Sequence, residues 1–272
     1  GAIVNTILDP IFIFAMDLGI EGAAWATVCS RIVFMAVGLY GVIRIHRLMA
    51  RPKLAAIKAD VPAFAGIAIP AILTNVATPT ANAYVTAAIA AHGDDAVAGW
   101  AIIGRVLPVA FGAIYALSSS IGPIIGQNYG AREDARMREA FRLALGVNVG
   151  LTLVAWVVLA LTSGYVVRLF GATGDAADLI LLFNVWLAPL FAFMGALFVA
   201  NAVFNTLDFP HYATVLNWGR ATIGTIPLVH LGSWLAGAEG VLTAHMAGGI
   251  LFGCLAVWVC LRLFDRLARE RT

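Results

Sequence analysis

The sequence predicts an all-α integral membrane protein with about eight transmembrane helices. Hydrophobic residues make up 61% of the 272 residues and charged residues only 12%, whereas about a quarter of the residues are charged in an average soluble domain. The hydrophobic residues gather in runs of about 20, the length that a helix needs to cross a bilayer. Strict alternation over ten-residue segments, which marks a membrane barrel, is missing from the sequence. Helices are therefore the expected way to pair every backbone group in lipid.

Eight apolar segments are expected to span the membrane, and turn signals such as DLGIEG, HGDD and NYGARED separate them. The first segment is short, and Gly1 already lies within its apolar run. We therefore expect the sequence to begin partway through a longer protein. The expected spans are 1–16, 22–43, 62–91, 96–126, 140–163, 176–206, 211–235 and 240–263.

Basic residues predict the orientation of these spans. If residues 44–61 face the cytoplasm, thirteen of the 17 lysines and arginines lie on that side, one lies on the other side and three lie within spans. This bias follows the positive-inside rule, and it predicts a plasma-membrane protein whose 44–61 linker and C-terminus are cytoplasmic. Acidic residues gather on the opposite side, namely Asp17, Glu21, Asp94, Asp95, Asp175, Asp178 and Glu239.

An internal repeat relates the first hairpin to the last. Six residues recur at an offset of 218 without a gap, which predicts two parallel repeats of six helices. We therefore expect residues 1–44 to be the last helical hairpin of an N-terminal lobe, 45–61 to be an inter-lobe linker, 62–265 to be a complete six-helix lobe and 266–272 to be a cytoplasmic tail. The recurring residues are Glu21, Gly22, Ala26, Ile32, Phe34 and Arg44, which match Glu239, Gly240, Ala244, Ile250, Phe252 and Arg262.

A carboxylate inside the first span is the strongest candidate for a functional group. At a rise of ~1.5 Å per residue, Asp9 lies roughly 15 Å from the turn at Gly19, near the middle of a ~30 Å hydrocarbon core. An ionisable group at that depth costs at least ~2.5 kcal/mol and is typical of ion or proton handling. Asn5 shares a helical face with Asp9, and Thr27 reaches a similar depth on the returning helix. We expect these three residues to form a coupling site, with Arg31 as a possible partner of Asp9. In the alternative interpretation, the pair of Asp9 and Arg31 is purely structural.

Polar residues at helical spacing predict a substrate cavity between the later spans. The third span carries a continuous polar stripe, which must turn away from lipid and either joins helices or lines a cavity. Prolines inside several spans permit bending, which suits a transporter better than a rigid anchor. Aromatic side chains of these spans could stack on flat ligands, although packing is their commoner role. The cavity candidates are Asn75, Thr78, Asn82, Tyr84, Arg105, Asn201 and Asn205.

Motifs of enzymes and of primary pumps are missing from the sequence. It contains no HExxH, GxSxG or GxxxxGK[ST] pattern, and its five histidines lack metal-ligand spacing. Its three cysteines lie in apolar runs without CxxC spacing and are expected to be reduced. We therefore expect a protein that is not an enzyme, that needs no cofactor or metal and that has no nucleic-acid partner. An ion gradient remains as its source of energy.

Several segments together resemble the multidrug and toxic compound extrusion (MATE) transporter family. The resemblance covers essentially the whole chain and implies twelve helices in two six-helix lobes with cytoplasmic termini, of which this chain holds helices five to twelve. It also implies export of drugs and other organic cations in exchange for H⁺ or Na⁺. The segments are LDPIFIF and GAAWATVCS in the first hairpin, followed by IPAILTN, AIIGRV, IGQNYGA and VFNTL.

The resemblance also bears on the coupling residues. In its proton-coupled prokaryotic members, an Asn and an Asp four apart on the fifth helix and a Thr on the sixth belong to the coupling network, and Asn5, Asp9 and Thr27 match them. Some sodium-coupled members carry acidic residues on the seventh and tenth helices. The matching positions here are Thr78 and Gly195, neither of which can replace a carboxylate, so the resemblance does not extend to a sodium site in the C-terminal lobe.

The predicted function is therefore a cation-coupled antiporter that works by alternating access in a lipid bilayer, with a drug or small organic cation as substrate. A lipid-linked oligosaccharide flippase of the same superfamily is one alternative, but it needs a cationic cavity, and only Arg31, Arg105 and Arg220 lie within spans. An intramembrane enzyme and a truncated product that transports nothing are the others. The substrate, the choice between H⁺ and Na⁺ and the oligomeric state stay open, with a monomer expected at full length.

Overall fold

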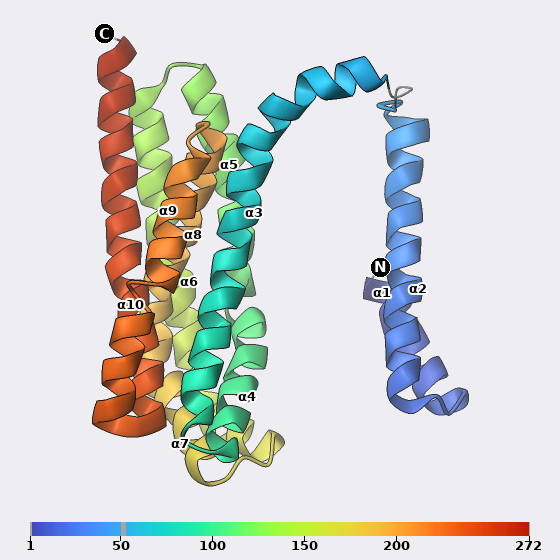
Figure 1. The fold of residues 1–272 in the computed structure, drawn as a ribbon, viewed down its shortest axis with the longest axis vertical. Helices are drawn as coiled ribbons and strands as arrows, with labels where there is room; N and C mark the ends of the chain where they lie inside the picture. The colour runs from blue at the N-terminus through green and yellow to red at the C-terminus, as the bar shows by residue number, and fades with distance from the viewer. Residues whose placement is uncertain (1, 50–52, 272) are drawn as a thin grey trace. The chain divides into compact units, whose positions relative to one another are not determined.

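The computed structural model describes residues 2–49 and 53–271, and these residues form helices and turns without a strand. This confirms the predicted all-α fold. The chain divides into two compact units, Gly1–Pro62 and Ala63–Thr272, each held together by its own helix contacts (Figure 1). The residues predicted to link two lobes, 45–61, belong to the first of these units.

The first unit is built on a helical hairpin. A widened, π-helical turn follows Pro10 directly, because the missing N–H of a proline removes one hydrogen bond of the α-helix. The first arm consists of α1 (Ala2–Pro10) and η1 (Ile11–Ala15), and the second arm consists of α2 (Gly19–Tyr40) and η2 (Gly41–Ile45).

Small residues on α2 let the two arms of this hairpin approach closely. Gly22, Ala26 and Ser30 recur every four residues and are the buried residues of α2. A Cβ atom at Gly22 would lie 2.6 Å from the carbonyl oxygen of Phe12, too close for any side chain. In lipid, where apolar surface alone gives little drive for association, such close backbone packing is a main way to join helices.

From α3 onward the helices run back and forth along the second unit (Figure 1). Helix α3 already begins at Leu54, so the predicted linker 45–61 is partly helical, while residues 50–52 of that linker lie outside the described residues. The elements are α3 (Leu54–Ala90), α4 (Asp94–Ala110), α5 (Gly112–Gly130), α6 (Asp134–Leu169), α7 (Gly174–Leu182), η3 (Phe183–Leu187), η4 (Ala188–Leu190), α8 (Phe191–Thr206), α9 (Pro210–Ala221) and α10 (Ile226–Arg271).

These elements follow the expected spans in order. The expected span 96–126 corresponds to α4 and α5, which are bent by 49° around Phe111. The expected spans 211–235 and 240–263 meet within α10, whose backbone is not helical at Ala236 and Gly237. By length and composition, four helical segments of the described residues can cross a membrane, or up to six if each bent pair counts as one. The total of eight therefore stays a prediction.

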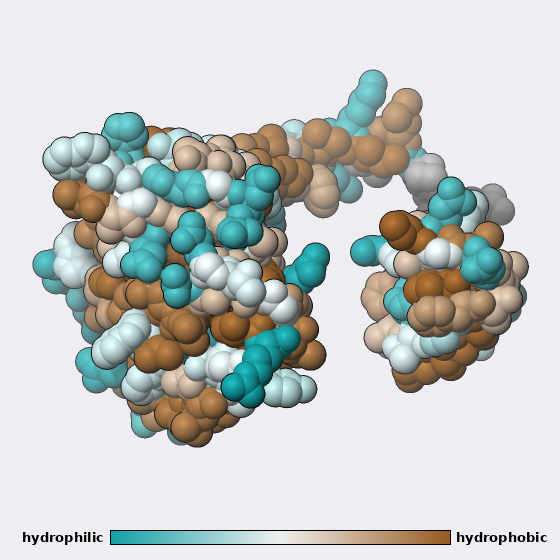
Figure 2. Space-filling model, turned by 90° about the horizontal axis from the view of Figure 1, so that it is seen from below, coloured by the Kyte–Doolittle hydropathy of each residue, from teal (hydrophilic) through white to brown (hydrophobic). Residues whose placement is uncertain are grey.

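The turns of the second unit gather at its two ends. The turns α3/α4 and α6/α7 and the break in α10 lie at one end, and the turns α5/α6 and α8/α9 lie at the other with the end of α10 (Figure 1). Seen from the first of these ends, hydrophilic residues are interspersed with hydrophobic ones on the surface (Figure 2). This alternation of turns is the arrangement that helices crossing back and forth require.

One of the predicted proline breaks is completed by a neighbouring helix. Pro189 lies in η4, directly after the π-helical turn η3. A proline leaves the carbonyl oxygen four residues before it without its helical donor. That carbonyl belongs to Val185, and it accepts a hydrogen bond of 2.8 Å from Trp156 Nε1 on α6. The break is thus satisfied inside the protein, as a membrane requires.

Glycines allow the two arms of α10 to pack closely against each other. They also allow α10 to pack closely against the turn that precedes it, at Gly224. A Cβ atom at Gly232 would collide with the carbonyl oxygen of Gly240, and a Cβ atom at Gly240 would collide with that of Gly232. Gly248 faces the carbonyl oxygen of Gly224 in the same way. Gly240 is the counterpart of Gly22 in the internal repeat, and each lies where the arms of its hairpin meet.

Candidate functional site

Two of the predicted coupling residues contact each other on α1. Asn5 Nδ2 donates a hydrogen bond of 2.7 Å to Asp9 Oδ2, and both side chains are half-buried. Thr27 is exposed and donates to the carbonyl oxygen of Ala23 on its own helix. Arg31 is exposed, and among the described residues it forms no ion pair with Asp9. The structure therefore brings together Asn5 and Asp9 and leaves Thr27 and Arg31 outside their hydrogen bond.

A cavity of about 200 Å³ lies within the second unit, between α3, α4, α5, α8, α9 and α10. No Asp or Glu is among the described residues that line it. Two of the predicted cavity residues, both from the polar stripe of α3, reach it together with four polar residues from other helices. The polar lining residues are Thr78, Asn82, Trp100, Tyr115, Arg220 and His245.

Arg220 is the charged group of this cavity. It belongs to the last turn of α9, and only 1% of its surface is exposed. Its Nη2 donates a hydrogen bond of 3.0 Å to Thr78 Oγ1, whereas its Nε has no hydrogen-bond partner in the described part of the chain. No Asp or Glu among the described residues forms an ion pair with it. A buried charge without a counter-charge is costly, and in a membrane it is a functional candidate by default.

A second buried polar group lies on the same lining. His245 on α10 meets the ring of Trp100 edge-on, with 5.9 Å between the ring centroids. Trp100 is held in place because its Nε1 donates a hydrogen bond of 2.9 Å to Thr86 Oγ1 on α3. His245 Nδ1 is buried and has no hydrogen-bond partner among residues 2–49 and 53–271. The cavity thus contains two side chains with unused hydrogen-bonding capacity, Arg220 and His245.

Aromatic rings form another part of the lining. The ring centroids of Tyr115 and Phe198 lie 5.4 Å apart, and Phe191 lies 6.3 Å from each of them. Phe111 stacks on Phe191 at 4.1 Å and supports it from outside the cavity. Trp186 in η3 is 72% exposed and does not line this cavity.

Three of the predicted cavity residues do not line this cavity and are exposed. Asn75 donates a hydrogen bond to the carbonyl oxygen of Ala71, on its own helix. Arg105 lies on α4 next to the lining residue Gly104 but is itself exposed, and Asn205 is exposed on α8. Their roles as substrate contacts stay predictions.

Two further predicted cavity residues pack between helices. Tyr84 packs against the buried core of the second unit. Asn201 on α8 accepts a hydrogen bond of 3.1 Å from Nδ2 of Asn217 on α9, which is itself buried. The polar stripes of the later helices therefore do both things that the sequence left open, because some of their residues join helices and others line a cavity.

The lining also contains three residues that were not predicted to belong to a cavity, namely Trp100, His245 and Arg220. Arg220 did carry a signal, because a charged residue inside an apolar span is rare and costly. Trp100 and His245 carried none, since isolated aromatic and histidine residues in apolar helices most often pack in the core.

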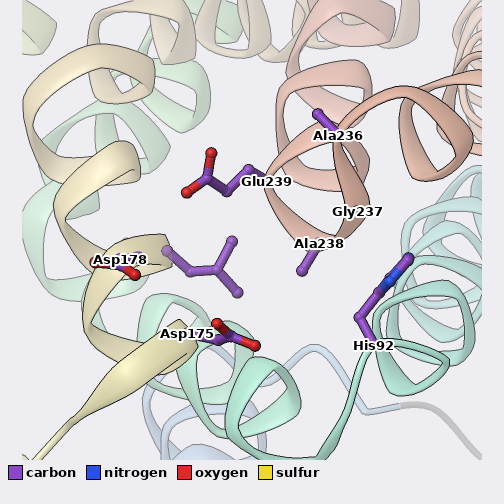
Figure 3. Close-up of a pocket in the computed structure, with 8 residues that line it drawn as sticks. His92, Asp175, Asp178, Ala236, Gly237, Ala238 and Glu239 are labelled. Carbon is purple, nitrogen blue, oxygen red and sulfur yellow. The ribbon is translucent and has the colours of Figure 1, made fainter.

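Three of the seven acidic residues expected on one side of the membrane line an open cleft of about 300 Å³ at one end of the second unit. Figure 3 shows Asp175 and Asp178 of α7 and Glu239 of α10 around this cleft, with His92 on the opposite wall. His92 Nε2 lies 2.8 Å from Ser233 Oγ. Among the residues that the structure describes, no group of three or more His, Cys, Asp or Glu could hold a metal ion.

The chain is similar to known transporters in sequence. The family model for MatE matches residues 70–230. An FAD transporter of Shewanella oneidensis is 30% identical over 271 residues, which cover 97% of this chain and 60% of that protein. The multidrug export protein MepA of Staphylococcus aureus is 25% identical over 272 residues, which cover 97% of this chain and 58% of that protein.

The chain is also similar in fold to a solved transporter. A crystal structure of the Vibrio cholerae MATE transporter VcmN superposes with a TM-score of 0.84 at 28% sequence identity. The superposition covers 98% of this chain and 60% of VcmN. The chain thus spans about 60% of the length of the relatives that it matches.

Proposed function

Because the chain belongs to the MatE family of membrane transporters, we propose that the protein exports small organic molecules by alternating access, in exchange for H⁺ or Na⁺. Members of this family are multi-pass membrane proteins that act as transporters, which confirms the prediction that the chain is not an enzyme. The positive-inside bias of the sequence supports a plasma-membrane location with residues 44–61 and the C-terminus in the cytoplasm.

The hydrogen bond between Asn5 and Asp9 carries the proposal that the transporter is ion-coupled. The amide of Asn5 occupies one oxygen of the Asp9 carboxylate and fixes its orientation. The remaining lone pairs of that carboxylate can accept H⁺ or coordinate Na⁺. An ion drives transport only if it binds the two conformations with different affinity, and a half-buried carboxylate next to a π-helical turn is a place where a change of helix shape would alter that affinity.

The cavity at Arg220 supports a view of the substrate that differs from the organic cation implied by the resemblance. A cation would meet the charge of Arg220, and none of the lining residues that the structure describes is a carboxylate that could offset it. The names of the relatives leave room for other substrates, since one is named for drugs and another for FAD, which carries phosphates as well as flat rings. The flippase alternative needs a cationic cavity too, but membership in the MatE family favours a substrate that is not bound to a lipid.

Replacing Asp9 with asparagine tests the coupling. In the complete reading frame that encodes residues 1–272, Asp9→Asn is expected to reduce ion-driven efflux by about 5- to 150-fold, the usual range of a coupling free energy. Efflux of a fluorescent dye from cells, measured with and without an imposed H⁺ or Na⁺ gradient, gives the result.

Asp17→Asn is the matched control for this experiment. Asp17 is an exposed carboxylate in the turn of the same hairpin, and asparagine tolerates its left-handed backbone. We expect this variant to keep normal efflux. Unchanged efflux with unchanged ion dependence in Asp9→Asn would eliminate the coupling role of Asp9.

A further inference from the structure

We propose that the cavity of the second unit binds the anionic group of a flat aromatic substrate, with Arg220 as the counter-charge. The inference rests on the proposed transport function and adds a substrate class to it. The substrate class is an aromatic ring system that carries a phosphate or a carboxylate.

The charge of Arg220 in the cavity supports an anionic ligand. Arg220 is almost fully buried, lines the cavity and has no carboxylate partner among the described residues. Removing one partner from a buried ion pair is strongly destabilising because it leaves an uncompensated charge. No carboxylate among the described lining residues offsets the charge of Arg220, so an anionic ligand would supply the counter-charge that these residues do not.

Buried nitrogen atoms on the lining of the cavity also have hydrogen-bonding capacity that is unused. Thr78 occupies one nitrogen of the guanidinium group, but Nε of Arg220 is buried without a partner. Arginine binds phosphate and carboxylate through two parallel N–H groups, which gives both strength and orientation. His245 Nδ1 is the second buried atom of the lining that lacks a partner. A polar group that enters the cavity would therefore meet atoms that nothing else satisfies.

The aromatic side chains of the cavity suit the remaining, uncharged part of the ligand. Tyr115, Phe191 and Phe198 form an aromatic cluster on the same lining as Arg220. Aromatic faces bind other flat rings in offset or edge-on geometry. A cavity of about 200 Å³ has room for one ring system with its charged group and leaves the remainder of a larger ligand outside. An anionic phospholipid shares the charged group but offers no ring for this cluster.

FMN and riboflavin form a matched pair of probes for this site, because they share one ring system and differ by a phosphate. The protein from the complete reading frame is placed in phosphatidylcholine nanodiscs, and binding is measured by the quenching of flavin fluorescence. We expect FMN to bind about tenfold more tightly than riboflavin or better, which is the usual effect of a hydrogen bond to a charged group.

Variants of Arg220 locate the preference. Arg220→Met should bind FMN no better than riboflavin, whereas Arg220→Lys should keep part of the difference. Arg168→Met removes an exposed arginine from the last turn of α6 and should leave the FMN preference unchanged. Tyr115→Leu should weaken both flavins and keep their ratio, and it tests the aromatic cluster even if Arg220→Met does not fold.

Several outcomes would overturn the inference. Equal binding of FMN and riboflavin, no binding of either at millimolar concentration, or an FMN preference that survives in folded Arg220→Met each contradicts it. If phosphatidylglycerol in the nanodisc abolishes FMN binding, the anion is a lipid headgroup and the aromatic substrate is wrong. Asp9→Asn should keep the ratio of FMN to riboflavin affinity, because a shift between conformations affects both flavins alike, so a failure of ion coupling and a failure of this site give different results.

Discussion

Truncating Phe141 to alanine is expected to destabilise the second unit by about 3–5 kcal/mol, the usual cost of removing a buried aromatic ring. Phe141 on α6 has no exposed surface, and it meets the ring of Phe264 on α10 edge-on at 5.6 Å. The space that the ring leaves cannot collapse easily, because two helices frame it. The loss is measured as a lower melting temperature of the purified protein in detergent.

Leu143→Ala is the matched control. Leu143 lies two residues further along α6 and is 63% exposed, so its truncation leaves no internal cavity. We expect its melting temperature to stay close to that of the unaltered protein. Equal losses in the two variants would show that α6 does not pack through Phe141.

Replacing Gly248 with alanine is expected to cost about 1–3 kcal/mol, because the added methyl group overpacks a helix contact. Its Cβ atom would collide with the carbonyl oxygen of Gly224, and a backbone atom cannot rotate out of the way. The effect is measured as a loss of folded protein after extraction and as a lower melting temperature.

The neighbouring glycine separates this collision from a general effect of alanine in α10. A Cβ atom at Gly249 would lie 3.2 Å from Sδ of Met194, the end of a flexible side chain that can move aside. Gly249→Ala should therefore be tolerated far better than Gly248→Ala. If both variants melt at the same temperature, the close approach at Gly248 is not a main contact of the unit.

The sequence predicted the helices well because their signal is local. Apolar runs and turn residues placed the breaks near 92, 131, 171, 208 and 237, close to where the helices end. The expected span 140–163 was shorter than its helix, Asp134–Leu169, whereas the expected span 211–235 ran across the turn between α9 and α10. Hydropathy detects only the part of a helix that suits lipid, whereas backbone hydrogen bonds continue into its polar ends. For the same reason the linker was expected to be longer than it is.

The candidate sites were predictable only where a single helix fixes the geometry. Asn5 and Asp9 meet because residues four apart share a face of one helix. The contact between Arg220 and Thr78 joins residues 142 positions apart, and it depends on how α3 and α9 rotate against each other. Nothing in the local pattern of either helix sets that rotation. The same holds for the hydrogen bond from Trp100 on α4 to Thr86 on α3.

The polar residues of α3 have a consequence for motion. Thr74, Asn75, Thr80 and Thr86 each donate a hydrogen bond to the carbonyl oxygen four residues earlier in their own helix. Because both partners of each of these hydrogen bonds belong to α3, the helix can rotate about its axis in an apolar environment and keep these bonds. Among the described residues, such a rotation must exchange the bonds that other helices make to α3, which are four from α9 to Pro70, Leu73, Thr74 and Thr78 and one from Trp100 of α4 to Thr86. Four of these five bonds come from α9, so α9 is the helix that chiefly fixes the rotation of α3 about its axis.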